Sequence, residues 1–146
     1  MKILKRSGTF EVHIPPDVKP GFRKILRVNF PVFNKFVVFV SDDHNKLIKE
    51  LRKCCQTEFI TESDPGTQYG VTYSTEYPDK IIGIWLNAPK QKIDAKLANT
   101  IAHESVHAIN TIFATAGVKT KPNNDETHAY HIGYLVEQIT EWIIGG

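Results

Sequence analysis

The sequence predicts an α+β domain in which a small, mostly antiparallel sheet packs against two long helices. Short runs of β-branched and aromatic residues, separated by turns that contain proline and glycine, occupy much of the chain before position 94. From position 94 onward, apolar side chains instead recur every three to four residues, as they do in amphipathic helices. Strands and helices that are segregated in this way are typical of the α+β class.

Composition points to one compact unit. The chain has 146 residues, 41% of them hydrophobic, which is enough to form a core, so we expect a single domain over residues 1–146. The N-terminus lacks the apolar run of a signal peptide, and the longest apolar stretches are too short to cross a bilayer. These features predict a cytoplasmic protein with no membrane span. The adjacent Cys54 and Cys55 argue against a disulfide framework and are expected to pack near a helix end.

The first half of the chain is expected to contain several strands and one short helix. Four prolines in the first forty residues favour edge strands and turns, and the strongest strand is 36–40. A helix is expected from about Asp42 to Cys55, with Ser41 as its N-cap and acidic residues in its first turn. Further strands are expected at 58–62, 70–75 and 80–87, separated by turns that contain proline.

Two longer helices are expected to follow. The first is capped by Asp94 and ends at Gly117, because its apolar residues repeat at helical spacing between these points. The second begins near Asn123 and ends near Trp142. Its inward face is expected to be the stripe Ala129, Ile132, Gly133, Val136, Ile139 and Ile143.

The first of these long helices contains the motif His103-Glu104-Ser105-Val106-His107. Histidines four residues apart lie one turn apart on the same helix face, so both imidazoles can reach one ion. Zinc suits nitrogen ligands, and a catalytic zinc site needs three protein ligands and one open position for water. Glu104 lies beside the first histidine, where a carboxylate can act as general base on such a water.

A third ligand is expected in the run Asn123-Asn-Asp-Glu-Thr-His-Ala-Tyr130 or just after it. The competing residues are Asp125, Glu126, His128 and His131. Glu126 is favoured because its helix face leads into the apolar stripe. His128 is the strongest rival because it lies at the margin of that stripe. A glutamate would complete the His₂Glu set that catalytic zinc sites use.

HESVH, followed nineteen residues later by Glu126 in NDETHAY, resembles the gluzincin zinc metallopeptidases. It is similar in particular to the small single-domain members called minigluzincins, over residues 80–142. The resemblance implies a zincin-like fold, a Zn²⁺ cofactor held by His103, His107 and Glu126, and Glu104 as the base. The larger family members have a second helical domain with transition-state donors, for which this chain has no room.

Two further roles are considered, namely stabilisation of the oxyanion and binding of an extended peptide. Tyr130, one turn beyond Glu126, can direct its hydroxyl at the oxyanion, and ordinary packing is an equally weighted alternative. His128 is the other candidate for this role. Residues 81–87 resemble the strand along which such enzymes bind an extended peptide, although a purely structural core strand explains Ile82, Ile84 and Leu86 more simply.

The function expected from these features is zinc-dependent hydrolysis of a peptide or protein substrate. One alternative is a non-catalytic zinc protein that recognises a partner through its cleft. Another is a peptidase that acts near nucleic acid, because the first quarter of the chain is basic. There, Arg23, Lys24 and Arg27 interleave with Phe22, Phe30 and Phe33, although phenylalanines more often fill a core. His13 and His44 are expected to be ordinary surface or core histidines.

Overall fold

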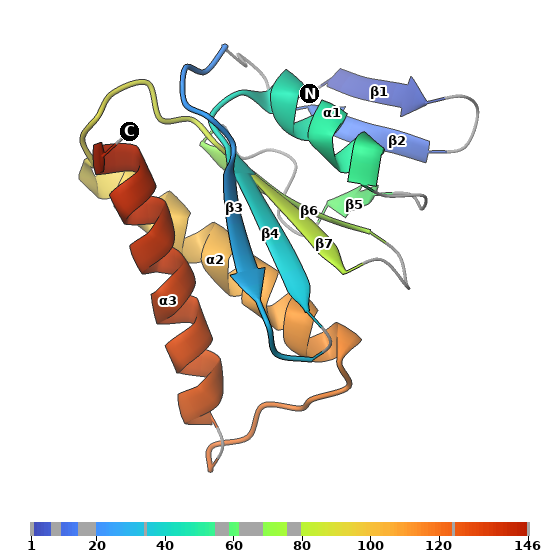
Figure 1. Cartoon of the computed structure of the whole chain (residues 1–146), viewed down its shortest axis with the longest axis vertical. Coiled ribbons are helices and arrows are strands. Elements are labelled where there is room, and N and C mark those ends of the chain that lie inside the picture. Colours follow the sequence, from blue (N-terminus) through green and yellow to red (C-terminus); the bar gives the residue numbers. More distant parts are fainter. Residues whose placement is uncertain are drawn as a thin grey trace.

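The computed structural model describes residues 2–6, 10–14, 20–33, 35–54, 59–61, 69–75, 80–123 and 125–145, and its elements confirm the α+β class (Figure 1). The helices of this part are α1 (His44–Cys54), α2 (Ala95–Thr115) and α3 (Asp125–Gly145). The strands are β1 (Lys2–Arg6), β2 (Phe10–Ile14), β3 (Leu26–Phe30), β4 (Phe36–Ser41), β5 (Phe59–Thr61), β6 (Gly70–Thr75) and β7 (Ile81–Leu86).

The main sheet of the described residues has the strand order β3-β4-β7-β6-β5, and β1 pairs separately with β2. Only β4 and β7 are parallel, and the other neighbours in the main sheet are antiparallel, as the sequence predicts. β7 lies inside the sheet, because β4 pairs with one of its edges and β6 with the other. β7 therefore offers no exposed edge to an extended peptide, so the resemblance of residues 81–87 to a substrate-binding strand is not supported and the alternative of a structural strand holds.

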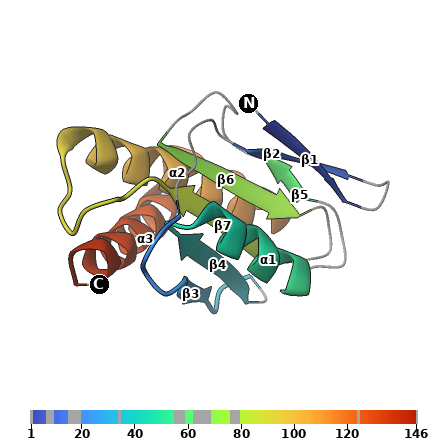
Figure 2. The same cartoon turned by 90° about the horizontal axis from the view of Figure 1, so that it is seen from above.

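Strand side chains alternate between two hydrophobic cores, one on each face of the sheet. In β7, Ile82, Ile84 and Leu86 join the core formed with α2 and α3, whereas Trp85 joins the core formed with α1. The structural interpretation of these three residues is thus confirmed. α2 and α3 lie side by side in both views (Figures 1 and 2). Gly83 lets α1 pack closely on β7, because a Cβ there would come within 2.6 Å of the Leu51 side chain and force it to move.

α1 begins later than predicted, because its N-terminal cap is Asp43 and not Ser41. The Asp43 carboxylate accepts a hydrogen bond of 3.0 Å from the amide of Lys46, and its carbonyl accepts one from Leu47. Ser41 is still part of β4, where it pairs with Trp85 of β7. Its hydroxyl instead holds the backbone of Asp43 in place, accepting from the amide at 3.0 Å.

A buried arginine, Arg23, joins its own segment to three others at one end of the sheet. Arg23 is 2% exposed, and its Nη1 donates to the Asp42 carboxylate at 3.0 Å and to the carbonyl of Ala88 at 2.6 Å. Its Nη2 donates to the carbonyls of Lys90 at 2.8 Å and of Ile143 at 3.3 Å. Because a buried charge is costly unless it is paired, these bonds fix where the four segments meet.

The burial of Arg23 corrects the basis of the nucleic-acid hypothesis. Phe30, another member of the interleaved basic and aromatic pattern, is 2% exposed and belongs to the core. Neither side chain can contact a phosphate or a base from the interior. Phe33 is half-buried and packs on Phe113, so the exposed members of the pattern are Phe22, Lys24 and Arg27.

Some expectations fall partly or wholly outside the described residues. Cys54 does end α1, but its side chain is exposed and not packed. Cys55, the turns at 64–66 and 77–79 and the side chain of His13 lie outside the described part of the chain. None of the helices in the described ranges combines the length and the apolar character needed to cross a bilayer. A cytoplasmic location stays a prediction.

His44, the first residue of α1, is a buried core histidine, as expected. Its Nε2 lies 2.6 Å from the hydroxyl oxygen of Tyr73 on β6, and its ring packs edge-on against Tyr73 and Trp85. Burial lowers the pKa of His44 from 6.5 to about 4, although the nearby Asp43 carboxylate acts in the opposite direction. Burial, and then the charge of Glu104, raises the pKa of Tyr73. Both side chains are therefore uncharged at neutral pH.

Acid should destabilise the fold through His44. The unfolded chain takes up a proton near pH 6.5 and the folded chain only near pH 4, so the stability is intact above pH 6.5 and is lost as the pH falls toward 4. Between pH 8 and pH 5, this residue should lower the free energy of unfolding by about 2 kcal/mol. Urea denaturation at both pH values measures the loss, and His44→Gln should reduce the pH dependence by that amount. Equal pH dependence in the two proteins would contradict the assignment.

Candidate metal centre

The candidate centre lies in the middle of α2, a helix whose ends are set by local sequence. Asp94 is the N-cap, as predicted, and its carboxylate accepts a hydrogen bond of 2.8 Å from the amide of Leu97. Gly117, just beyond the C-terminus, has a φ of 76°, a left-handed conformation that glycine adopts without strain. These two stops leave the HESVH motif within a continuous helix.

His103 and His107 lie together on one face of α2. Their Nε2 atoms are 3.1 Å apart, and their ring centroids are 4.7 Å apart. The side chain of His103 is 52% exposed, and His107 is half-buried. Two nitrogens bound at 2.0–2.1 Å to a tetrahedral zinc are separated by about 3.3 Å. The histidine pair therefore fits two corners of such a site with little movement.

Glu104 lies beside His103, on the side of α2 that packs on the sheet. It is fully buried, and its Oε1 accepts a hydrogen bond of 2.7 Å from the hydroxyl of Thr72 on β6. Its Oε2 has no hydrogen-bond partner among the described residues and lies 3.9 Å from His103 Nε2. A buried carboxylate oxygen without a donor is unfavourable. A water molecule near His103 Nε2, either free or bound to a metal, would supply the hydrogen bond that Oε2 lacks.

Gly70 allows α2 to approach β6 this closely. A Cβ at position 70 would lie 2.6 Å from the Thr100 side chain and 3.1 Å from Cγ of Glu104. A larger residue here would displace the Thr100 side chain and press on that of Glu104. Sequence reasoning missed Gly70 and Thr72. Strand alternation could have indicated that Thr72 lies on the same sheet face as the apolar Ile82 and Ile84. Nothing in the sequence indicates that Glu104 is its hydrogen-bond partner.

The candidate ligands on α3 are not gathered with the histidine pair. Among the described residues, no three His, Cys, Asp or Glu side chains form a group that could hold a metal ion. Glu126 is exposed in the first turn of α3. His128 faces α2, where its Nε2 lies 2.6 Å from the side-chain oxygen of Asn110 and its ring packs on Phe113. Because Asn110 is three residues after His107, His128 is held about one turn beyond the pair.

The inward stripe of α3 explains this arrangement and differs from the predicted one. Leu135, Ile139 and Ile143 are the buried residues of this helix, and the stripe continues through the half-buried Ile132 and His128. The predicted members Ala129 and Gly133 are exposed, so the prediction of the inward face was wrong at these positions. Larger apolar side chains gain more from burial, so Leu135 and not Gly133 sets which side of α3 meets α2.

Tyr130, the candidate oxyanion donor, and His131, a candidate metal ligand, lie near the start of α3. Tyr130 is 68% exposed, and its ring contacts His131 edge-on. The Nδ1 of His131 lies 2.7 Å from the carbonyl of Thr127, and its ring lies near Phe30 and Phe113. His131 is therefore engaged within α3 and its core contacts. Neither side chain reaches the histidine pair in this arrangement.

Comparison with protein-family models, with curated proteins and with solved structures finds no match to this chain.

Removing the Thr72 hydroxyl should destabilise the protein. Thr72→Val keeps the shape of the side chain but leaves Oε1 of the buried Glu104 without its donor. The free energy of unfolding should fall by about 1–3 kcal/mol, the usual effect of leaving a buried polar group unpaired. Urea denaturation at pH 7 measures this, with Thr115→Val, an exposed threonine at the end of α2, as the matched control. Equal stabilities of the two variants would show that this bond is unimportant.

Proposed function

We propose that the chain is a zinc-dependent metallopeptidase in which His103 and His107 bind the metal and Glu104 is the general base. The observation that carries the proposal is the combination of two imidazole nitrogens 3.1 Å apart with a buried carboxylate beside them. A histidine pair at this spacing is found in many helices. A fully buried glutamate whose second oxygen has no hydrogen-bond donor among the described residues and lies 3.9 Å from the His103 imidazole favours a functional role for the carboxylate.

The chain's own residues divide the chemistry between them. Zinc, when bound, supplies polarisation of the peptide carbonyl and a water of lowered pKa. Thr72 holds Oε1 of Glu104, which leaves Oε2 as the atom that accepts a proton from the attacking water. Glu104 then delivers this proton to the leaving amine nitrogen. The buried surroundings of the carboxylate keep bulk water from competing for the proton.

The start of α3 supplies the third ligand in this proposal. Glu126 follows from the gluzincin resemblance, and α3 must turn about its axis for this exposed carboxylate to face α2. Tyr130 would then approach as well, because it lies one turn away on the same helix face, where its hydroxyl can donate to the oxyanion. His128 is the alternative ligand, and it would have to leave its contact with Asn110 and approach the histidine pair by about one helical turn.

Glu104→Gln should separate metal binding from catalysis. The amide keeps the size of the side chain but cannot accept the proton, so cleavage should fall by at least about 100-fold while zinc binding is retained. His107→Ala should lose both. The assay is cleavage of a proteome-derived peptide mixture by zinc-loaded protein, analysed by mass spectrometry. Glu141→Gln, an exposed carboxylate on α3, is the matched control. Cleavage that persists in Glu104→Gln would belong to a contaminant and would contradict the proposal.

The third ligand is identified by zinc affinity. Glu126→Gln should weaken zinc binding by more than the roughly 10-fold to 100-fold that loss of an outer partner causes. Competition with a chromogenic chelator measures the affinity, and Asp125→Asn provides a control carboxylate in the same helical turn. His128→Asn should leave the affinity unchanged. If His128→Asn is the damaging variant and Glu126→Gln is not, the ligand is His128.

A further inference from the structure

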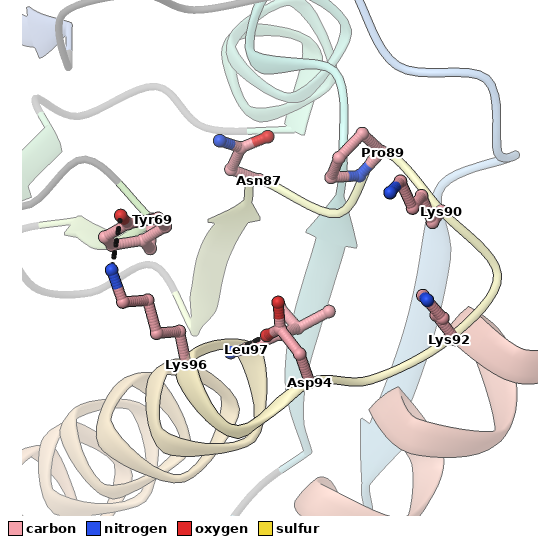
Figure 3. Close-up of a pocket in the computed structure, with 8 residues that line it drawn as sticks. All are labelled: Tyr69, Asn87, Pro89, Lys90, Lys92, Asp94, Lys96 and Leu97. Atoms are coloured by element: carbon pink, nitrogen blue, oxygen red, sulfur yellow. Dashed lines mark hydrogen bonds between the residues drawn. The ribbon is translucent and has the colours of Figure 1, made fainter.

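A basic hollow lies beside the start of α2, outside the histidine pair (Figure 3). It has a volume of about 340 Å³ and is lined by Tyr69, Asn87, Lys90, Lys92, Asp94 and Lys96 among others. These residues come from the segment before β6, the loop that follows β7, and the first turn of α2. The three lysines outnumber the single carboxylate around the hollow.

The charges of the hollow are available to a ligand. Asp94 is already used as the helix cap, since its Oδ1 accepts from the amide of Leu97. Lys96 extends toward Tyr69, with its Nζ 3.4 Å from the hydroxyl oxygen and 5.4 Å from the ring centroid (Figure 3). Lys90 and Lys92 are exposed, and neither forms an ion pair with a described residue. The positive end of the α2 dipole adds to the attraction for an anion.

The hollow is held in shape by bonds from the protein interior. Arg23 donates to the carbonyls of Ala88 and Lys90, so the loop that bears two of the lysines is tied to a buried guanidinium. The amide of Asn87 donates to the carbonyl of Tyr69 at 2.8 Å, which joins the other wall to the end of β7. A preformed binding site loses less entropy when a ligand binds.

The hollow is in line with the candidate metal centre. Lys96 and His103 are seven residues apart, which places them on the same face of α2 about 10 Å from each other along the helix axis. An extended peptide spans about 3.3 Å per residue, so about three residues would bridge this distance.

We infer that the hollow is a subsite for a carboxylate of the peptide substrate, about three residues from the bond that is cut. The inference rests on the proposed peptidase function, because that function places the cleaved bond at the histidine pair and so orients the peptide along α2. Two sources supply the same chemistry, namely an acidic side chain within the peptide and the free carboxylate at a peptide C-terminus.

Binding to the Glu104→Gln protein tests the subsite without cleavage. The probes are fluorescein-labelled alanine-rich hexapeptides: one with a central glutamate and an amidated C-terminus, one with a free C-terminus and no acidic side chain, and one with neither. Fluorescence anisotropy at low ionic strength measures the affinity. At least one of the carboxylate peptides should bind several-fold more tightly than the neutral peptide, and which of them does so identifies the source. When Lys90→Ala and Lys92→Ala are introduced into the Glu104→Gln protein, the binding of that carboxylate peptide should weaken by about five-fold, in line with the loss of two exposed ion pairs.

Lys24→Ala together with Lys46→Ala is the matched control, because it removes two exposed lysines elsewhere on the molecule. Equal binding of all three peptides, or equal loss in the control, would overturn the subsite. If zinc-loaded wild-type protein cuts no peptide but carboxylate binding still depends on Lys90 and Lys92, the peptidase proposal fails and the carboxylate site stands.

Discussion

One buried carboxylate, on the face of α2 that also carries the core residues Ile101 and Ala108, ties this helix to the sheet. Glu104 has no exposed surface and satisfies one of its oxygens with the hydroxyl of Thr72. Turning α2 about its axis by one residue, about 100°, would break this bond and would also carry the histidine pair away from its present face. The burial of Glu104, together with that of the apolar residues on the same face of α2, thereby determines where His103 and His107 point. One interaction connects the packing of the fold with the geometry of the candidate centre.

Arg23 has a comparable role at the end of the sheet where β4 and β7 finish. It joins α3 near its C-terminus, the segment before α1, and the loop after β7, and its charge is balanced by Asp42. Because this loop also forms a wall of the basic hollow, an interior contact shapes a possible binding surface. The candidate centre and the hollow are therefore both positioned by buried charged side chains that contact the sheet or the segments around it.

The sequence predicted well what depends on neighbours along the chain and poorly what depends on distant partners. Helical periodicity and the Asp94 cap placed α2 to within a few residues, and the spacing of the histidines placed both on one face. The contact between Glu104 and Thr72, 32 residues apart, left no local signal. Arg23 resembled a surface cation because nothing near it in sequence shows that Ile143 lies against it. The inward face of α3 was right at Ile139 and Ile143 but wrong at Ala129 and Gly133, since contact with α2 decides which side is buried.

The most direct test of the central claim is the position of zinc itself. Crystals of the protein grown with zinc and measured at the zinc absorption edge would locate the metal by its anomalous signal. The account predicts one ion bound by Nε2 of His103 and Nε2 of His107 at about 2.0–2.1 Å, on the side of Glu104 Oε2. An ion bound elsewhere, with the two imidazoles free, would contradict it.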